Sequence, residues 1–468
     1  MAVTEKDLRA IEEIVGAENV LTEKEDVEAY LYDEIEKNFR PEAAAGCIVV
    51  KPADTEEVSA VCCLAYEQEI PVTVRGGGTG LAGGCTPAET GIILSMERMK
   101  NIIEIDEENM VAVLEAGVTL AEFLEELEHH DGISFPLHPG DEGAEIGGMA
   151  ATNAGGARAV RHGVMRKNIL GIEVVLPAGD VLQLGGKTIK NNAGYNLCQL
   201  ILGSEGTLAV ITRVIVRIFP EEKYTATLVL PFEEIRDACE AVSDIMKSGV
   251  NPLAVEYMDK KLFVGTAEML GLEWQAKKGN ADLMVILSEQ TEDRLYDAAA
   301  AIEEIGDAHG CYEALIADKK SEQEKLLRIR SEHYSYIVDS ICDSFDYAVP
   351  PSAIPDFVTG LKELAADYGN ECNIVAHLAD GNVHGDMAYV DGKVPEYAEE
   401  YKKKIYELVF SFGGTITGEH GIGKSRVQDL KMQLPEKELE LMRGIKKVFD
   451  PKGLLNPGSV LDEPEPED

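Results

Sequence analysis

Four segments rich in glycine constrain this chain more than any other feature of its sequence. They are residues 75–84, 140–156, 179–206 and 413–423. Before the first, the alternating apolar residues Val72 and Val74 predict a short strand that ends at Gly76. Glycine permits unusual φ angles and close approach to the backbone, so successive N–H groups can point at a phosphate. For this loop alone, a flexible turn is the simpler interpretation.

Within this segment Gly78, Gly80 and Gly83 match the G-x-G-x-x-G pattern of dinucleotide-binding Rossmann folds. That pattern requires a strand, a tight turn and then a helix. Here residues 85–90 (CTPAET) lead directly into 91–96 (GIILSM), a second apolar strand, which leaves no room for a crossover helix. The sequence therefore allows a pyrophosphate-binding loop and excludes a Rossmann domain at this position.

Two more glycine-rich loops are predicted in the same region, at 146–163 and 194–212. The first contains Thr152 and Asn153 as hydrogen-bonding side chains, and the second contains Gly-Ser-Glu-Gly-Thr at 203–207 before an apolar strand. Three such loops in one domain indicate a large phosphate-bearing cofactor that is held mainly by backbone groups.

The chain length and the apolar pattern predict several domains. A single core rarely extends over 468 residues, so two or three domains are expected. Strands at 225–232 and 281–289 alternate with helices at 233–249 and 292–306. This alternation is typical of an α+β domain with an antiparallel sheet. We predict a first domain at 1–220, a second at 221–410 and a C-terminal segment at 411–468.

The composition excludes several classes of function. Acidic residues number 85 against 43 basic ones, and the resulting net charge of −42 repels nucleic acid and anionic lipid. No apolar run approaches the ~20 residues that a membrane span requires. The N-terminus reads as an amphipathic helix capped by Thr4 rather than as a signal peptide, which predicts a cytoplasmic protein. The nine cysteines include no C-x-x-C pair, so an iron–sulfur cluster is not expected.

Several motifs in a fixed order resemble one family. They are RGGGTG (75–80), Pro139 with Gly140, IGG (146–148), TNAGG (152–156), GSEGT (203–207) and FDPKGLLNPGSV (449–460). Over nearly the whole chain they resemble the vanillyl-alcohol oxidase / p-cresol methylhydroxylase superfamily, and within it the FAD-linked D-2-hydroxyacid dehydrogenases. The resemblance implies an α+β fold, with a two-subdomain FAD-binding domain, an antiparallel-sheet cap domain and a helical C-terminal tail.

The resemblance also implies where FAD binds. Residues 75–80 would lie against the pyrophosphate, 146–156 along the flavin and ribityl chain, and 203–211 near the adenine. The residues carried over as FAD contacts are Arg75, Gly76, Gly77, Gly78, Thr79, Gly80, Pro139, Ile146, Gly148, Thr152, Asn153, Gly155, Gly156, Glu205, Gly206, Ile211 and Asn456. Relatives that attach FAD covalently through the first loop use a histidine there. Because this chain has Thr79, its FAD is expected to be noncovalent.

His377 and His384 flank the tripeptide Asp-Gly-Asn in a chain with only nine histidines. The tripeptide is typical of a turn, so we predict two strand ends that present one imidazole each across a tight loop. Together with Glu419 they form a credible ligand set for Zn²⁺, Fe²⁺ or Mn²⁺, although a lone histidine is more often a structural residue. The resemblance implies that His377, His384 and Glu419 are the metal ligands.

The residues expected to act on the substrate come from two further motifs. His420 cannot easily bind the same ion as its neighbour Glu419, so it is expected to be the general base that takes a hydroxyl proton. A carboxylate substrate favours a guanidinium partner, and the resemblance assigns this role to Arg330, with Arg328 on a solvated helix face. Some relatives that act on dicarboxylates carry a lysine where this chain has Ser344, which favours D-lactate or, next, glycolate.

Reduced FAD requires an external electron acceptor, because the sequence contains no cluster motif, haem motif or membrane anchor. In the family the acceptor is an iron–sulfur subunit, a quinone or cytochrome, or an electron-transferring flavoprotein. The acidic composition favours a soluble protein, and we expect electron-transferring flavoprotein, as in complexes that couple lactate oxidation to NAD reduction.

Several other functions are compatible with parts of the sequence. Two enzyme alternatives are an oxidase that uses O₂ and a D-2-hydroxyglutarate dehydrogenase. An NADPH-dependent reductase of the UDP-MurNAc type shares the FAD fold, but the His377, His384 and Glu419 set argues against it. A flavin- and metal-binding regulatory module is the non-enzyme alternative, and the full set of expected catalytic residues argues against it.

Overall fold

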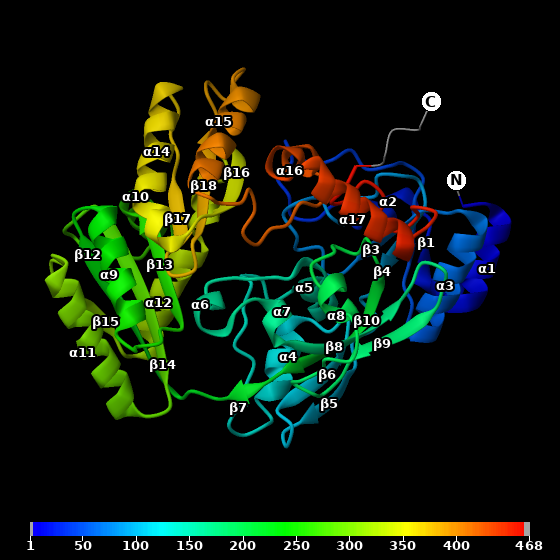
Figure 1. Cartoon of the computed structure of the whole chain (residues 1–468), viewed down its shortest axis with the longest axis horizontal. Helices are drawn as coiled ribbons and strands as arrows, with labels where there is room; N and C mark the ends of the chain where they lie inside the picture. Colours follow the sequence, from blue (N-terminus) through cyan, green and yellow to red (C-terminus); the bar gives the residue numbers. More distant parts are fainter. Residues whose placement is uncertain (1–2, 463–468) are drawn as a thin grey trace. The chain divides into compact units, whose positions relative to one another are not determined.

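The computed structural model describes residues 3–462, which divide into two compact units (Figure 1). Unit 1 contains residues 3–155, 164–220 and 419–462. Unit 2 contains residues 156–163 and 221–418. The chain therefore leaves unit 1 for most of its second half and returns to it at the C-terminal end.

Unit 1 is built from short strands and helices. Its strands are β1 (Val20–Leu21), β2 (Ile48–Val50), β3 (Val72–Arg75), β4 (Ile92–Ser95), β5 (Ile102–Asp106), β6 (Val111–Glu115), β7 (Ile133–Ser134), β8 (Ile169–Val175), β9 (Val181–Gly185), β10 (Val210–Arg217) and β11 (Phe219–Pro220). Its helices are α1 (Glu5–Val15), η1 (Ala17–Asn19), α2 (Lys24–Glu28), α3 (Thr55–Gln68), α4 (Leu120–Leu127), α5 (Ile146–Thr152), α7 (Met165–Asn168), α8 (Leu197–Ile201), α16 (Val427–Gln433) and α17 (Glu436–Phe449).

Two main sheets organise unit 1. The first has the order β1-β2-β4-β3, in which β4 pairs in parallel with both β2 and β3. The second has the order β5-β6-β10-β8-β9 and is antiparallel throughout. The connection from β3 to β4 contains no helix, so the prediction that this glycine-rich loop is not part of a Rossmann unit is confirmed.

The predicted N-terminal helix is confirmed as α1, which begins after Thr4. The Asp7 N–H donates to the Thr4 hydroxyl over 3.3 Å, and the Thr4 N–H donates to the Asp7 carboxylate over 3.1 Å. This reciprocal pair is a capping box, which satisfies donors that the first turn leaves unpaired. Ile11 and Val15 of α1 are buried, so packing fixes the helix against the first sheet.

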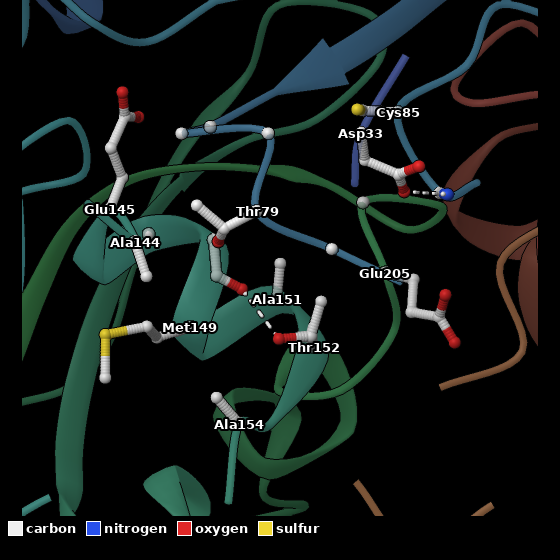
Figure 2. Close-up of a pocket in the computed structure, with 18 of the residues that line it drawn as sticks. Asp33, Thr79, Cys85, Ala144, Glu145, Met149, Ala151, Thr152, Ala154 and Glu205 are labelled. Atoms are coloured by element: carbon white, nitrogen blue, oxygen red, sulfur yellow. Dashed lines mark hydrogen bonds between the residues drawn. The ribbon is translucent and has the colours of Figure 1, made fainter. Parts of the chain in front are cut away.

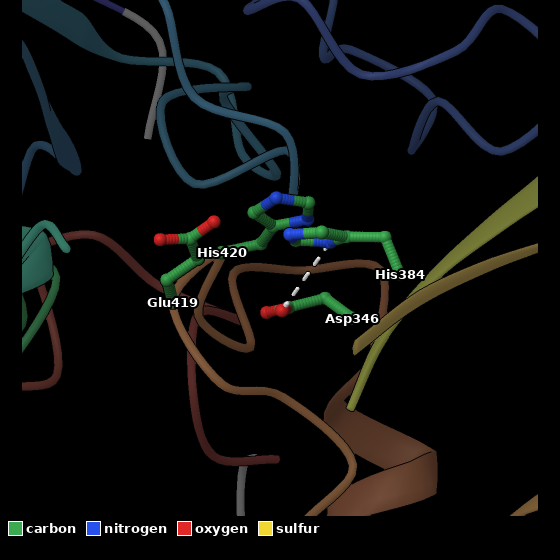
Figure 3. A group of neighbouring side chains, drawn as sticks. All are labelled: Asp346, His384, Glu419 and His420. Carbon is green, nitrogen blue, oxygen red and sulfur yellow. Dashed lines mark ion pairs between the residues drawn. The ribbon is translucent and has the colours of Figure 1, made fainter. Parts of the chain in front are cut away.

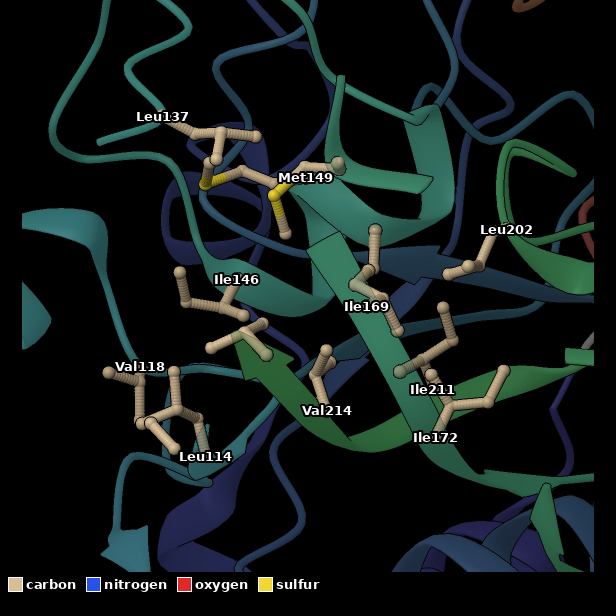
Figure 4. Packing of buried hydrophobic residues seen from close by; sticks show 14 of the residues in the cluster. Leu114, Val118, Leu137, Ile146, Met149, Ile169, Ile172, Leu202, Ile211 and Val214 are labelled. Carbon is tan, nitrogen blue, oxygen red and sulfur yellow. The ribbon is translucent and has the colours of Figure 1, made fainter. Parts of the chain in front are cut away.

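The core of the second sheet supports the glycine-rich segments (Figure 4). Ile172 of β8 and Val214 of β10 are almost fully buried, and Ile146 and Met149 of α5 pack into the same cluster. Burial of such apolar side chains contributes roughly 1.5–3 kcal/mol each. This packing fixes the position of α5, whose small residues therefore lie at a defined place beside the β3–β4 loop.

The prediction of loops across residues 146–163 and 194–212 is wrong in part, because residues 146–152 form α5 and residues 197–201 form α8. In α5 the glycines permit close packing rather than an irregular backbone. A Cβ atom on Gly147 would lie 2.5 Å from the Cβ of Ala116. A glycine count alone does not distinguish these two uses of glycine.

The C-terminal segment completes the first sheet. The Val72 N–H donates to the Leu454 carbonyl over 2.8 Å, and the Asn456 N–H donates to the Val72 carbonyl over 2.7 Å. Residues 454–456 therefore pair with β3, the strand that leads into the first glycine-rich loop. This pairing brings Asn456 next to that loop even though it lies more than 370 positions later in the chain.

Unit 2 is built around one large sheet. Its strands are β12 (Tyr224–Phe232), β13 (Ala254–Asp259), β14 (Ala281–Glu289), β15 (Leu315–Ala317), β16 (Ile341–Ala348), β17 (Ile374–His377) and β18 (Asn382–Ala388). Its helices are α6 (Ala159–His162), α9 (Ile235–Lys247), α10 (Lys260–Met269), α11 (Glu292–Ala308), α12 (Lys320–Ser331), α13 (His333–Ile337), η2 (Pro351–Ala353), α14 (Ile354–Asp367) and α15 (Ala398–Ser411).

The seven strands have the order β15-β12-β14-β13-β17-β18-β16, and every neighbouring pair is antiparallel. The predicted antiparallel sheet is therefore confirmed, with β12, α9, β14 and α11 at the expected places. Among residues 3–462 we find no helix with the length and apolar character needed to cross a membrane.

Candidate functional site

Unit 1 contains a cavity between the β3–β4 loop, α5 and the segment that precedes β10 (Figure 2). Of the residues expected to bind FAD, those that line it are Gly76, Gly77, Gly78, Thr79, Gly80, Pro139, Gly148, Thr152, Gly155, Glu205, Gly206, Ile211 and Asn456. Residues from four separated parts of the chain therefore meet around one space, as the resemblance implies for an FAD site.

The cavity wall suits a large cofactor that is bound by backbone groups. A Cβ atom on Gly77 would lie 2.5 Å from the Gly143 carbonyl oxygen, so only glycine allows this close approach. A Cβ atom on Gly148 would meet no atom within 4 Å, so the backbone there faces open space. The Thr152 hydroxyl donates to the Gly148 carbonyl over 3.0 Å and fixes this part of α5. The wall therefore fits FAD.

Gly148→Leu is expected to fold but to bind FAD at least about tenfold more weakly. The new side chain would occupy cavity space, while the substitution improves helix propensity in α5. The measurement is the ratio of flavin to protein absorbance after purification. Gly444→Leu is the matched control, since Gly444 lies in α17 with open space around its Cβ position and outside the cavity. Full FAD content in Gly148→Leu would contradict the assignment of the cavity.

Four residues expected to contact FAD do not line the cavity. The Arg75 guanidinium donates to the Tyr32 carbonyl over 2.7 Å and so ties the strand end to the N-terminal segment. Ile146 is fully buried in the core, and Asn153 ends α5 with a φ of 54°. Gly156 belongs to unit 2. These residues shape the surroundings of the loops, and their contact with FAD stays a prediction.

Several cavity residues carry no signal in the sequence. Asp33 and Cys85 line the cavity, and the Gly84 N–H donates to the Asp33 carboxylate over 3.1 Å. Glu145 also lines it, directly before α5. Asp33 lies far from any motif in the sequence, so it cannot be recognised before the fold brings it to the cavity. Glu419 and His420, expected at the chemical centre, line the same cavity of unit 1.

In unit 2, His377 and His384 lie side by side on the antiparallel strands β17 and β18. His377 pairs with Asn382 and Val375 pairs with His384, so both imidazoles project from the same face of the sheet. Their ring centroids are 5.6 Å apart with an interplanar angle of 89°. The predicted turn between two histidine-bearing strands is confirmed.

Glu256 of β13 joins His377 to Arg330. The His377 Nδ1 lies 2.6 Å from one oxygen of the Glu256 carboxylate, and the Arg330 Nη2 lies 2.6 Å from the other. Burial raises the pKa of Glu256, but the charges and hydrogen bonds of His377 and Arg330 outweigh burial and lower it from 4.5 to about 2. The sequence did not indicate Glu256, because the partners are separated by more than 70 positions.

Glu256→Ala is expected to lower the free energy of unfolding by about 3–5 kcal/mol, because it leaves the guanidinium of Arg330, whose side chain is only 15% exposed, without its partner. Since folding lowers the pKa of Glu256, the stabilisation is present at neutral pH and is lost as the pH falls from 4.5 towards about 2. Urea denaturation at several pH values measures both effects. Glu371→Ala is the control, because its pair with Lys261 is exposed and should matter little. Equal stability of the two variants would contradict the role of Glu256.

Asp346 of β16 is a fully buried carboxylate that the sequence analysis missed. It accepts hydrogen bonds from the Asn382 amide over 2.7 Å, the Thr417 hydroxyl over 2.8 Å and the Gly418 N–H over 2.9 Å. The His384 Nδ1 lies 3.7 Å from one of its oxygens, as the dashed line in Figure 3 marks. Asp346 therefore connects His384 with the glycine-rich segment that ends unit 2.

Glu419 and His420 follow Gly418 directly in the chain and are the first residues of the segment that returns to unit 1. Figure 3 draws Asp346, His384, Glu419 and His420, a group of side chains of the types that bind divalent metals. His377, which was expected as a ligand, is not in this group, and its Nδ1 is bound by Glu256.

Comparison with known families agrees with this geometry. Residues 47–185 match the FAD binding domain family, and residues 221–460 match the family described as FAD linked oxidases, C-terminal domain. The chain is 41% identical over 434 residues to a protein named D-lactate dehydrogenase from Archaeoglobus fulgidus, covering 93% of this chain and 96% of that protein. It is 34% identical over 429 residues to a glycolate oxidase subunit, GlcD, from Bacillus subtilis, covering 88% of each.

The fold is also that of a solved enzyme structure. A crystal structure of p-cresol methylhydroxylase with substrate bound superposes with a TM-score of 0.78 at 18% identity, covering 98% of each chain. At 18% identity this likeness shows the fold alone. The family is shown by the matches to the two FAD-related family models, which together span both halves of the chain. The chain belongs to the family of FAD-linked oxidases, and it is an FAD-dependent oxidoreductase.

Proposed function

We propose that this protein oxidises a D-2-hydroxy monocarboxylate to the corresponding 2-oxo acid, with D-lactate favoured and glycolate next. The similarity over almost the whole chain to a protein named D-lactate dehydrogenase carries this proposal. The similarity to the glycolate oxidase subunit of Bacillus subtilis supports the same class of small hydroxy acid. Bound FAD would supply the chemistry of the oxidation by accepting a hydride from C2 of the substrate.

His420 is proposed to take the proton from the substrate hydroxyl. It lines the cavity that fits FAD, which supports a role next to the bound cofactor. An imidazole takes and releases protons near neutral pH, which suits a general base. Glu419, the preceding residue, lines the same cavity.

His377, His384 and Glu419 are proposed to bind a divalent Zn, Fe or Mn ion. Imidazole and carboxylate groups suit these ions, and a bound ion would lower the pKa of the substrate hydroxyl. The contact between the His377 Nδ1 and the Glu256 carboxylate supports this role, since a metal-binding histidine usually donates its other nitrogen to a carboxylate or carbonyl. Asp346 lies beside the His384 Nδ1 and is proposed to orient that ring.

Arg330 is proposed to bind the substrate carboxylate. Glu256 holds the guanidinium through Nε at 2.8 Å and Nη2 at 2.6 Å, which fixes its plane. A fixed guanidinium fork binds a carboxylate with less loss of side-chain entropy than a mobile one. The same carboxylate therefore positions both Arg330 and His377 on one face of the unit 2 sheet.

Ser344 supports a monocarboxylate substrate. It lies two residues before Asp346 on β16, so both side chains are on the same face of the sheet. A lysine at this position could pair with a second carboxylate, whereas a serine hydroxyl carries no charge. A D-2-hydroxyglutarate dehydrogenase is the second candidate, and it would require another cation to meet the distal carboxylate.

We propose an external protein acceptor for the electrons, with electron-transferring flavoprotein favoured over O₂, and a cytoplasmic location. The net charge of −42 supports a soluble partner with a complementary basic surface. Reduction of purified electron-transferring flavoprotein in the presence of D-lactate, compared with peroxide formation in air, tests this part. Rapid peroxide formation with no transfer to the flavoprotein would instead indicate an oxidase.

Steady-state turnover with an artificial dye as acceptor tests the reaction itself. We expect D-lactate to yield pyruvate at a rate well above that with D-2-hydroxyglutarate. A clear preference for D-2-hydroxyglutarate would contradict the monocarboxylate proposal while leaving the D-2-hydroxyacid class intact.

A further inference from the structure

Glu145 is a buried acid in the FAD cavity whose position the family motifs do not explain. It immediately precedes α5 and lines the cavity, and only 5% of its surface is exposed (Figure 2). Its Oε2 atom has no hydrogen-bond partner within residues 3–462. A buried polar atom without a partner costs about 1–3 kcal/mol, so such an atom at a ligand cavity calls for an explanation.

The neighbouring backbone places the Glu145 side chain beside the first glycine-rich loop. A Cβ atom on Gly76 would lie 3.4 Å from the Glu145 Oε2, and a Cβ atom on Gly77 would lie 3.4 Å from the Glu145 backbone nitrogen. The loop that contains these glycines is the one expected to lie against the FAD pyrophosphate. Glu145 therefore faces the most negatively charged part of the expected cofactor.

A structural role does not account for the side chain. Glu145 precedes α5, but its carboxyl group makes no capping hydrogen bond to that helix. Glu205 is another glutamate that lines the cavity. Its carboxylate accepts hydrogen bonds from the N–H groups of Ile422 and Gly423 over 2.9 and 2.7 Å. The Glu205 carboxylate thus fixes the position of residues 422–423, whereas the unpaired oxygen of Glu145 fixes no other segment.

The surroundings of Glu145 favour its neutral form. The pKa of Glu145 rises from 4.5 to about 8; burial is the largest cause, the negative charges of Glu97 and Glu122 act in the same direction, and Arg75 acts in the opposite direction. These are the charged groups of the surrounding elements that act on it. At neutral pH the side chain therefore carries a proton, and its O–H group can donate a hydrogen bond to an anionic acceptor.

We propose that Glu145 binds FAD as a neutral carboxylic acid, donating a hydrogen bond to a phosphate oxygen of the cofactor, so that FAD affinity is linked to this proton. An ionised Glu145 in the same place would repel the pyrophosphate. The inference rests on FAD binding and not on the proposed substrate, so it holds or fails independently of the hydroxy acid.

The linkage has a definite sign. Below about pH 8 the acid is already protonated in the free protein, and FAD affinity is expected to be constant. Above that pH the free protein loses the proton while the FAD complex retains it. The dissociation constant of FAD is then expected to rise by up to about tenfold per pH unit.

Release of FAD on serial dilution of the purified holoprotein, followed by flavin fluorescence from about pH 7 to about pH 9.5, tests this proposal. Glu145→Gln retains a hydrogen-bond donor that does not titrate. It is expected to bind FAD at all these pH values and to lose most of the increase above about pH 8. Glu142→Gln is the matched control, since Glu142 is exposed three residues earlier, and it should behave as the unmodified protein.

Calorimetry of FAD binding to the apoprotein in two buffers of different ionisation enthalpy gives a second readout, which counts protons directly. Uptake of close to one proton per FAD near about pH 9 is expected for the unmodified protein and none for Glu145→Gln. No proton uptake by the unmodified protein, or an unchanged pH dependence in Glu145→Gln, would overturn the proposal. Substrate turnover does not enter either measurement.

Discussion

His420→Ala is expected to slow reduction of the bound flavin by substrate by about 10²–10⁴-fold, because the general base for the hydroxyl proton is removed. The variant should retain FAD, since backbone groups and the other cavity residues remain. It should also retain the metal ion, because His420 is not among the proposed ligands. Anaerobic single-turnover absorbance measures the rate of flavin reduction. Elemental analysis measures the metal content, and the flavin absorbance of the purified protein measures the FAD content.

His129→Ala is the control for this experiment, because His129 is exposed on the surface of unit 1, outside the cavity. It should reduce flavin at the normal rate. A normal rate in His420→Ala would refute its assignment as the base. Loss of the metal ion from His420→Ala would indicate instead that His420 is a ligand, in the group of side chains drawn in Figure 3.

The second large effect is expected for His384→Ala, which should lose the divalent ion and, with it, most of the activity. Removal of a ligand weakens binding by more than the roughly 10–100-fold that loss of an outer partner costs. FAD should stay bound, because His384 belongs to unit 2 and does not line the FAD cavity. Elemental analysis after dialysis, compared with flavin absorbance of the same sample, separates the two cofactors.

His309→Ala serves as the control for His384→Ala, since His309 lies in unit 2 and pairs with Asp244 at 3.0 Å, away from β17 and β18. It should keep both the ion and the flavin. A full complement of metal in His384→Ala would refute the proposed ligand set. Loss of FAD together with the ion would show that the substitution disturbs the fold and does more than remove one metal ligand.

The parts of the fold that follow local patterns could be predicted from the sequence. Alternating apolar residues at 225–232 and 281–289 correspond to β12 and β14, and the intervening helix appears as α9. The turn between His377 and His384 is signalled by Asp-Gly-Asn, because these residues adopt turn conformations that apolar residues avoid. In each case the information lies within a few neighbouring residues.

The site residues that carry no signal in the sequence depend on contacts between distant segments. Glu256 meets Arg330 and His377 only because β13 pairs with β17 in the middle of the unit 2 sheet. Asp346 meets His384 through the pairing of β16 with β18. A buried carboxylate of this kind looks like any other acid in a chain with 85 of them.

The glycine-rich segments show a different limit. Glycine serves a phosphate loop, a turn and a close helix contact equally well, and Gly147 in α5 is needed for the last of these uses. The order of the motifs, rather than any one of them, identified the FAD site. The same motifs contain no information on Glu145, whose importance lies in burial and an unpaired oxygen.

Anaerobic mixing of the purified protein with D-lactate, L-lactate, glycolate and D-2-hydroxyglutarate tests the central claim most directly. The flavin absorbance near its visible maximum is followed with and without a chelator. We predict rapid bleaching by D-lactate, or by glycolate, but not by L-lactate, and loss of this bleaching after chelation. Bound FAD that none of the four acids reduces would contradict the proposed function.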